Sequence, residues 1–297
     1  MKIIRKIKEI YKTLKKHPVT RGNEILGLYH YISFNLRNRV SNEIVYNWIE
    51  GIKFIAQKGD AGIVANIYFG LYEFEESIFL LHFVEKEDVF LDVGANVGHY
   101  SLLMSGLKKC RSIAIEPVPK TYCKLKKQVD LNNLNALIEI KNIGVSNEVS
   151  ELFFSTDKGT MDRIVDENYK NAVSVHVETI DSIVKNNIPI AIKIDVEGYE
   201  KYVLDGASET LLNEHLKIVI LELNQSGKKY GFDDHEIYLK IKDFGFEPYL
   251  YDLENRKLIK QESYNKNQFN TIFVRDPDFV TSRLANSRKI KIRNKLF

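Results

Sequence analysis

The 297-residue sequence is poor in cysteine, proline and tryptophan, with two, six and one of each. The cysteines, Cys110 and Cys123, are too few for a disulfide framework or a cysteine-rich zinc site, which favours a reducing compartment. No apolar run approaches the ~20 residues of a membrane-spanning helix, and the densest, Ile78 to Val84, is short. The N-terminus also lacks the uninterrupted apolar stretch of a secretory signal peptide. We therefore expect a globular, cytoplasmic protein.

Several catalytic signatures are missing as well. The histidines form no H-x-x-x-H pair and have no acids at ligand spacing, so no metal is expected. Neither a G-x-S-x-G elbow nor a phosphate-binding P-loop is present, which argues against simple hydrolases and kinases. His99 follows a glycine-rich loop, and we interpret it as a packing residue of a first helical turn rather than a cofactor ligand.

The small net charge of +3 conceals an uneven distribution. Residues 1–21 contain eight Lys and Arg against one Glu, and residues 275–297 contain seven against two Asp. Because the two ends carry +7 and +5, the segment between them carries −9. Basic ends on an acidic body argue against a nucleic-acid groove through the core, so we expect no nucleic-acid partner and assign any polyanion or lipid contact to the termini.

The first segment has the pattern of a basic amphipathic helix. Ile3, Ile7, Ile10 and Leu14 fall at helical spacing, Lys and Arg fill the other face, and Pro18 marks the end. One interpretation is peripheral docking on an anionic membrane at the inner face of the cell. The other is a helix that packs on its own domain and leaves its basic face in solvent.

From residue 85 the pattern alternates between strands and helices. Buried strands are predicted at 89–93, 113–115, 137–143, 190–194 and 217–223, with an antiparallel closing pair at 246–251 and 270–275. Helices between them indicate parallel βαβ units, and thus an α/β, doubly wound, Rossmann-like sheet. Residues 151–178 suggest an inserted hairpin around a mobile polar loop at 156–170, and residues 23–60 a mainly helical pattern. The predicted parts are a helical N-terminal extension (1–65), a central domain (66–276) and a basic tail (277–297).

The loop after the first strand predicts the cofactor. Asp92 lies at the end of the strand, and Gly94, Asn96 and Gly98 follow it at the turn into the next helix. A dinucleotide-binding loop needs glycine where this chain has Asn96, and Asp92 would repel a pyrophosphate. S-adenosyl-L-methionine has no phosphate, and its carboxylate suits a helix N-terminus. Glu116 ends the next strand, where an acid can accept both ribose hydroxyls.

A second acidic cluster follows two later strands. Asp195 ends a buried strand next to the point where open α/β sheets place ligands, and Glu222 ends the following strand. Glu197 and Glu200 could instead cap the helix that begins there. We interpret Asp195 as functional and Glu200 as a capping residue.

These motifs resemble one family. The string 91–100, Glu116, "KIDVEGYEKYVLDGA" (193–207) and "VILELN" (219–224) are similar to the FkbM family of class I S-adenosylmethionine-dependent methyltransferases, over about residues 70 to 250. The resemblance implies a seven-stranded sheet and O-methylation of a hydroxyl on a sugar, glycan or natural product, as in polysaccharide biosynthesis. By position it also implies that Asp92, Gly94, Asn96, Gly98 and Glu116 line the cofactor, that Val145 or Ser146 approaches the adenine, and that Asp195 lies where donor and acceptor meet.

The acceptor side is predicted less directly. Asp195 is the first candidate for the general base, with Glu197 and Glu222 behind it. The resemblance includes the segment around Tyr72 and Glu73, which we expect to contact a hydroxyl-bearing, carbohydrate acceptor such as a sugar, glycan or glycolipid precursor. Many family members have His where this chain has Asn224, which leaves no base at that position. Two alternatives stay open: a methyltransferase of a small soluble natural product, and a non-catalytic adenosyl-binding scaffold.

Overall fold

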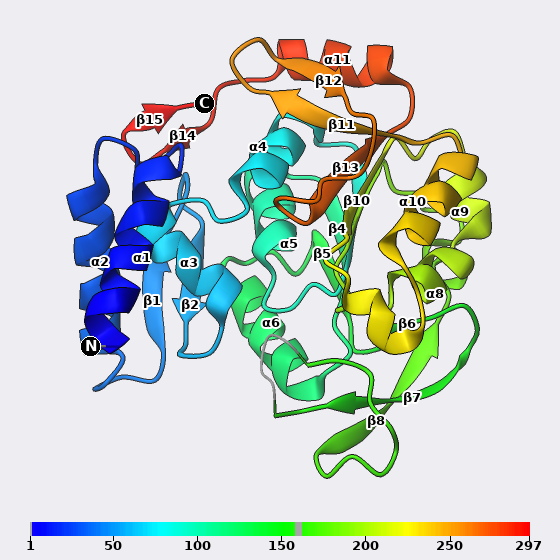
Figure 1. The fold of residues 1–297 in the computed structure, drawn as a ribbon, viewed down its shortest axis with the longest axis horizontal. Coiled ribbons are helices and arrows are strands. Elements are labelled where there is room, and N and C mark those ends of the chain that lie inside the picture. The colour runs from blue at the N-terminus through cyan, green and yellow to red at the C-terminus, as the bar shows by residue number, and fades with distance from the viewer. Residues whose placement is uncertain (1, 158–161) are drawn as a thin grey trace.

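The computed structural model describes residues 2–157 and 162–297, with side chains from residue 5 onward, and is built on one large mixed sheet (Figure 1). In the described residues the sheet has eight strands in the order β12-β11-β13-β10-β9-β3-β4-β5. Their bounds are β3 Val89–Val93, β4 Arg111–Ile115, β5 Ile138–Lys141, β9 Ala191–Ile194, β10 Ile218–Glu222, β11 Glu247–Asp252, β12 Lys257–Lys260 and β13 Asn270–Val274. The parallel core β5-β4-β3-β9-β10 and the antiparallel β13 confirm the doubly wound prediction.

The predicted count of seven strands is one too low. β12 pairs antiparallel with β11 and forms an additional edge. Its sequence is short and has lysine at both ends, which is how exposed edge strands avoid pairing with other chains. The same features make such a strand difficult to recognise in a sequence.

Helices cover both faces of this sheet because the buried strands are apolar on both sides. Phe90 faces the cluster of α4 (Phe74–Phe83), α5 (His99–Leu103) and α11 (Pro277–Asn286), whereas Leu91 faces the cluster of the opposite layer. That layer contains α7 (Ile180–Val184), α8 (Glu200–Asp205), α9 (Ser208–Leu212) and α10 (Asp234–Asp243). A π-helical turn, Met104–Lys108, continues α5. Helix α6 (Pro119–Leu131) packs beside β4 and β5. A 3-10 turn, Ser226–Tyr230, precedes α10.

The predicted hairpin is confirmed. β7 (Ser150–Ser155) pairs antiparallel with β8 (Ala172–Glu178), and β6 (Gly144–Val145) lies parallel to β8. Residues 158–161 of the predicted polar loop lie outside the described residues. After them the chain returns alongside β7, where Ser155 donates its backbone N–H to the Arg163 carbonyl at 2.9 Å.

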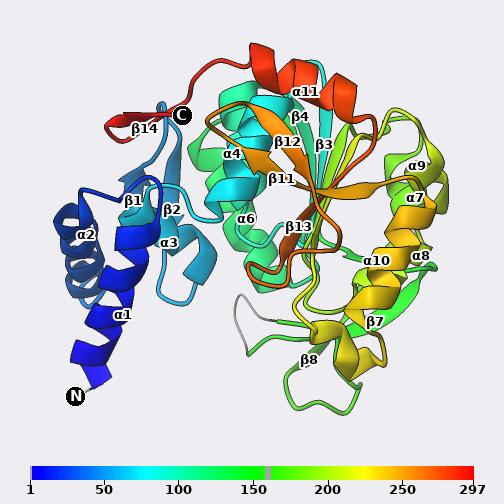
Figure 2. The same cartoon turned by 45° about the horizontal axis from the view of Figure 1, so that its top comes forward.

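The N-terminal residues form a unit beside the sheet, with α1 (Lys2–Lys16), α2 (Glu24–Arg37) and α3 (Ala61–Phe69) as its helices (Figure 2). The helical prediction for residues 23–60 is wrong at 44–56, where β1 (Ile44–Asn47) and β2 (Lys53–Ala56) form an antiparallel hairpin. The turn between them places Glu50 and Gly51 at φ +46° and +89°, which a helix does not allow.

Helix α1 packs on this unit. Leu14 is fully buried against Ala65 and Phe69 of α3, while the described Lys and Arg side chains of α1 are exposed. This arrangement is the second of the two interpretations of the amphipathic helix. In the described residues, none of the helices combines the length and apolar character needed to cross a bilayer.

The basic tail is folded and returns to the N-terminal unit. After α11, strands β14 (Lys291–Ile292) and β15 (Lys295–Leu296) pair antiparallel. Arg288 forms an ion pair with Glu50 at 2.7 Å, and Lys295 Nζ donates to the Pro18 and Arg21 carbonyls, each at 2.7 Å. Figure 2 shows this connection crossing from α11 to the N-terminal unit.

Candidate active site at the carboxyl edge of the sheet

The glycine loop joins the ends of three strands. The backbone N–H groups of Gly94 and Ala95 donate to the Ile115 carbonyl, at 3.0 and 2.9 Å. Gly94 has φ +80°, and a Cβ at this position would lie 1.9 Å from the Asp195 carbonyl oxygen. Only glycine fits there, because the end of β9 approaches the loop backbone so closely.

Asp92 holds the helix that follows the loop. The buried carboxylate accepts hydrogen bonds from the backbone N–H and hydroxyl of Ser101, at 3.0 and 2.5 Å. Burial raises the pKa of Asp92 to about 6, against the lowering effect of these bonds. Asp92 therefore fixes the first turn of α5 against the end of β3.

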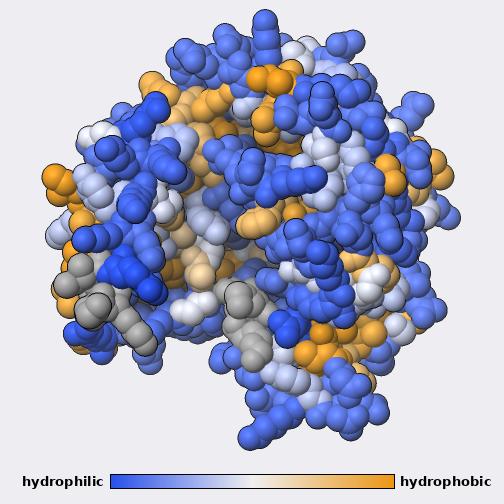
Figure 3. Space-filling view, in the orientation of Figure 1, coloured by the Kyte–Doolittle hydropathy of each residue, from blue (hydrophilic) through white to orange (hydrophobic). Residues whose placement is uncertain are grey.

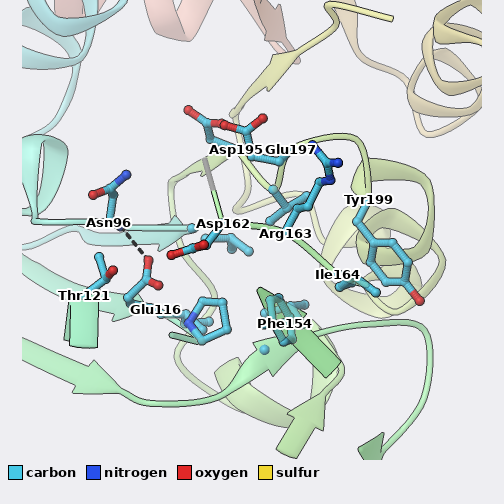
Figure 4. A pocket seen from close by; sticks show the side chains of 17 residues that line it. Asn96, Glu116, Thr121, Phe154, Asp162, Arg163, Ile164, Asp195, Glu197 and Tyr199 are labelled. Atoms are coloured by element: carbon cyan, nitrogen blue, oxygen red, sulfur yellow. Dashed lines mark hydrogen bonds between the residues drawn. The ribbon is translucent and has the colours of Figure 1, made fainter. Parts of the chain in front are cut away.

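Glu116 is held by two backbone donors from different segments. Its Oε2 accepts from the Asn96 N–H at 3.0 Å (Figure 4), and its Oε1 accepts from the Val118 N–H at 2.9 Å. Burial raises its pKa to about 7. Each oxygen keeps a further lone pair for a ligand, and the positive φ of Asn96, +51°, directs its N–H toward this carboxylate.

A first pocket opens beside Glu116 (Figure 4). It encloses about 780 Å³, including solvent at its mouth. The predicted residues on its wall are Gly94, Asn96, Glu116, Val145, Asp195 and Glu197. Ser146 is buried but is not on this wall, and its carbonyl lies against Gly206. Gly98, at φ +89°, supports the loop from behind, where a Cβ would meet Leu125.

Sequence reasoning missed several residues of the first pocket. Phe154, Asp162, Arg163 and Ile164 come from the inserted hairpin and the segment that returns beside it. The Ile164 carbonyl accepts from the Tyr230 hydroxyl at 3.1 Å, which ties the segment to the opposite rim. The available signal was the predicted insertion with its polar loop, but the residues that reach the pocket could not be identified because the register of the hairpin was not readable from the sequence.

A second pocket adjoins the first and shares four residues with it: Gly94, Asn96, Asp195 and Glu197. Its own wall adds Tyr72, Glu73, Asp92, Lys193 and Glu222. In the space-filling view the surface is hollowed between the N-terminal unit at the left and the body of the molecule (Figure 3). The shared residues mark the boundary between the two adjoining pockets.

Lys193 is the charged residue of this pocket that was not predicted from the sequence. It occupies the middle of β9 between two isoleucines and is 1% exposed, and its Nζ lies 3.2 Å from Asp195 Oδ2. A lysine inside an otherwise apolar buried strand was the available signal, since buried ammonium groups need anionic partners. The surrounding carboxylates outweigh burial and raise the pKa of Lys193.

Asp195 and Glu222 lie on neighbouring strands. Ile194 pairs with Leu221 in the parallel register of β9 and β10, so the two acids that follow them face the same side as Lys193. Burial and, after it, the Asp195 charge raise the pKa of Glu222 to about 8. Glu197, at φ +56°, is next to them, and burial raises its pKa as well.

The approach segment brings two further predicted residues to this pocket. Glu73 precedes α4 at φ +47° and accepts a hydrogen bond from the Tyr100 hydroxyl at 2.6 Å. Burial raises the pKa of Glu73, and it raises that of Tyr72 to about 12. Tyr72 is 37% exposed, so its ring is available to a ligand.

Three other side chains have structural contacts. His99 lies between Asn66 and Ser77, with nitrogen contacts of 3.1 and 2.9 Å, and burial lowers its pKa to about 3. Glu200 accepts from the Gly198 N–H at 3.1 Å and lines neither pocket. The Asn224 side chain accepts from the Ser226 N–H at 2.8 Å and caps the turn before α10. These positions agree with the packing and capping interpretations.

Comparison with known proteins places this architecture in a family. Residues 92–248, more than half of the chain, match the family described as the methyltransferase FkbM domain. No curated protein matches the chain. Among solved structures, TYW2 of P. horikoshii in complex with MeSAdo is 13% identical and has a TM-score of 0.40, with 78% of this chain and 70% of that chain covered.

Two further solved structures show a likeness at a similar level. The precorrin-6y C5,15-methyltransferase of Geobacter metallireducens GS-15 is 10% identical, with a TM-score of 0.38 and coverage of 68% and 86%. An rRNA methylase of Streptococcus thermophilus is 13% identical, with a TM-score of 0.36 and coverage of 67% and 91%. From the family match over the glycine loop and the acidic cluster, the chain belongs to the FkbM family of S-adenosyl-L-methionine-dependent methyltransferases.

Proposed function

We propose that this protein transfers a methyl group to a hydroxyl of a sugar-containing acceptor. The observation that carries the proposal is the wall that the two pockets share, where Asp195 and Glu197 border both spaces. The methyl donor occupies the first pocket and the acceptor the second. Transfer then takes place at the shared edge, so both ligands need to be present together.

The residues of the first pocket fit S-adenosyl-L-methionine. Glu116 is fixed by the N–H groups of Asn96 and Val118, and its remaining lone pairs suit two ribose hydroxyls. Val145 and Phe154 supply apolar wall for a planar base. When bound, the cofactor supplies a methyl group on a sulfonium, which is already activated, so positioning accounts for much of the acceleration.

A carboxylate at the shared edge takes the acceptor proton. As the new C–O bond forms and the C–S bond breaks, the electron pair stays on sulfur and the hydroxyl proton passes to the base. Asp195 is our first assignment, because it borders both pockets and Lys193 fixes its position at 3.2 Å. Glu222, with a pKa of about 8, is the second candidate, since a base works best near the operating pH.

The second pocket favours a neutral, hydroxyl-rich acceptor. Glu73, Asp195, Glu197 and Glu222 outnumber the single cation Lys193 on its wall. Carboxylates accept hydrogen bonds from hydroxyls and repel anions at this range. Tyr72 adds an exposed ring against which the C–H face of a sugar can pack.

Asp195→Asn tests this proposal. We expect affinity for S-adenosylhomocysteine to stay within about tenfold, because Glu116 and the loop are unchanged, while methyl transfer falls ~10²–10⁴-fold. The measurements are calorimetric titration and transfer of labelled methyl to a panel of glycosides and small phenols. Asp243→Asn, on the exposed end of α10, is the matched control.

Equal loss of binding and turnover would make Asp195 a cofactor ligand rather than the base. Transfer to phenols without transfer to glycosides would support the alternative of a small natural-product acceptor. Tight binding without transfer to any acceptor would support the non-catalytic scaffold.

A further inference from the structure

A third pocket lies in the N-terminal unit, away from the residues that match the family. We call it the N-terminal pocket; it is bordered by Arg37, Tyr46, Trp48, Asn66 and Arg293 and encloses about 960 Å³, including solvent at its mouth. It brings together α2, the β1–β2 hairpin, α3 and the C-terminal hairpin β14–β15. The basic tail thus completes a cavity that neither end of the chain forms alone.

The charge of this pocket is positive and not compensated. None of the described residues on its wall is Asp or Glu, and within residues 2–157 and 162–297 neither Arg37 nor Arg293 has an ion pair with a carboxylate. Arg283 and Arg288, on the same tail, pair with Asp88 and Glu50. Arg293 therefore differs from the two other arginines of the tail, Arg283 and Arg288.

Arg293 is held in place but is not neutralised. Its Nη2 donates to the Ile67 carbonyl at 2.7 Å, whereas its buried Nη1 has no hydrogen-bond partner in the part of the chain that the structure describes. Burial lowers the pKa of Arg293, with no acid nearby to oppose it. A partly buried guanidinium with a free donor is costly unless an anion binds to it.

Aromatic rings line the wall next to these cations. Trp48 is fixed by its indole N–H, which donates to the Gly70 carbonyl at 2.7 Å. Tyr46 stacks on Phe54, with ring centroids 5.9 Å apart, and the Arg37 guanidinium lies 5.4 Å above the Tyr46 ring. Fixed aromatic faces beside a guanidinium suit a ring that carries an anionic group.

We propose that the N-terminal pocket binds a sugar phosphate, with the phosphate at Arg37 and Arg293 and the sugar ring against Trp48 and Tyr46. Free, nucleotide-linked and lipid-linked glycosyl phosphates share this chemistry. Planar, bidentate guanidinium groups match phosphate geometry, and two of them supply the charge that the phosphate requires.

This pocket is separate from the methyl-transfer site. Trp48 and Asn66 form part of its wall, and both contact His99, which lies on the wall of the second pocket. The Trp48 and His99 ring centroids are 5.4 Å apart, and the Asn66 amide nitrogen lies 3.1 Å from His99 Nδ1. One layer of side chains therefore divides the two spaces, and the inference does not depend on the proposed acceptor.

The chain supplies its own reporter, because Trp48 is its only tryptophan. The experiment titrates the full-length protein with glucose 1-phosphate, glucose and inorganic phosphate and follows Trp48 fluorescence. We expect a saturable change with glucose 1-phosphate at a Kd below about 1 mM, the range of a few good polar contacts. Glucose and inorganic phosphate each bind at least about tenfold more weakly, since each lacks one half of the contacts.

Variants on α2 localise the binding. Arg37→Gln weakens glucose 1-phosphate binding by about tenfold or more, as expected for loss of a charged hydrogen bond. The matched control is Arg39→Gln, which removes the same charge two residues later from an exposed side chain outside the pocket. Both variants should keep wild-type affinity for S-adenosylhomocysteine, which shows that they are folded and that the sites are distinct.

Three results would overturn the proposal. The first is no saturable change with glucose 1-phosphate at millimolar concentration. The second is equal weakening by the two variants, which would indicate a general charge effect. The third is binding of glucose or inorganic phosphate as tightly as glucose 1-phosphate, which would remove the role of the phosphate or of the ring.

Discussion

Gly94→Ala tests the geometry on which the site depends. The new methyl group would start 1.9 Å from the Asp195 carbonyl oxygen, and real Cβ contacts essentially never fall under 3.0 Å. The loop and the end of β9 must therefore separate by more than about 1 Å. Overpacking of this kind costs about 1–3 kcal/mol, and an alanine at positive φ costs about 1–2 kcal/mol more.

Gly231→Ala separates these two effects. Gly231 has φ +85°, close to the +80° of Gly94, and a Cβ there would meet nothing within 4 Å. We expect Gly231→Ala to lower the free energy of unfolding by about 1–2 kcal/mol, and Gly94→Ala to lower it by about 2–5 kcal/mol. The assays are urea unfolding followed by circular dichroism and calorimetric titration with S-adenosylhomocysteine.

Cofactor binding and methyl transfer should also distinguish Gly94→Ala from Gly231→Ala. Because Gly94 and Asp195 border both pockets, a displacement of about 1 Å should weaken cofactor binding and reduce transfer up to ~10²-fold, whereas Gly231→Ala changes neither. If Gly94→Ala is as stable as Gly231→Ala and binds S-adenosylhomocysteine normally, the close approach of β9 is not what requires glycine at this position.

Three carboxyl groups give pH-dependent predictions. Affinity for S-adenosylhomocysteine should rise as the pH passes through about 7, where Glu116 ionises, and calorimetry on Glu116→Gln should show a loss of about tenfold or more and no such rise. The methyl-transfer rate should rise to a plateau above about pH 8 if Glu222 is the base, and an unchanged profile in Glu222→Gln would leave that role to Asp195. Glu76 is buried with a pKa of about 8, above its ordinary 4.5, so the folded state binds more protons and the free energy of unfolding falls as pH rises between these values. Urea unfolding of Glu76→Gln should show a flatter pH dependence and higher stability at pH 8; the same slope as wild type would contradict this assignment.

The part of the fold that sequence reasoning recovered is the part governed by local patterns. The strands at 89–93 and 190–194 are apolar except for Asp92 and Lys193, and the observed β3 and β9 match them closely. Parallel strands bring their carboxyl ends to one edge, which is why Glu116, Asp195 and Glu222 could be grouped before any coordinates. The roles of these residues stay predictions until the variants are measured.

The part that was missed depends on contacts between distant segments. The β1–β2 hairpin has strands of four residues, too short to show a clear alternation. In the sequence Lys193 only interrupts an apolar run, because the carboxylates that surround it become apparent only in the folded structure. The tail was predicted only as a basic segment that could contact a polyanion or a lipid, yet Arg288 pairs with a residue 238 positions away.

The return of the basic tail to the N-terminal unit, through β14 and β15, also affects the order of folding during synthesis. A ribosome releases a chain from its N-terminus, and early segments fold as they emerge. Lys295 donates hydrogen bonds to the carbonyls of Pro18 and Arg21, and Phe297 packs against Phe74. These contacts can form only after the strands of the sheet have been translated. These contacts of the N-terminal unit are therefore missing until residues 288–297 have been translated, and the N-terminal pocket closes only after the sheet strands are made. Binding at that pocket would thus report that the tail has docked on the N-terminal unit.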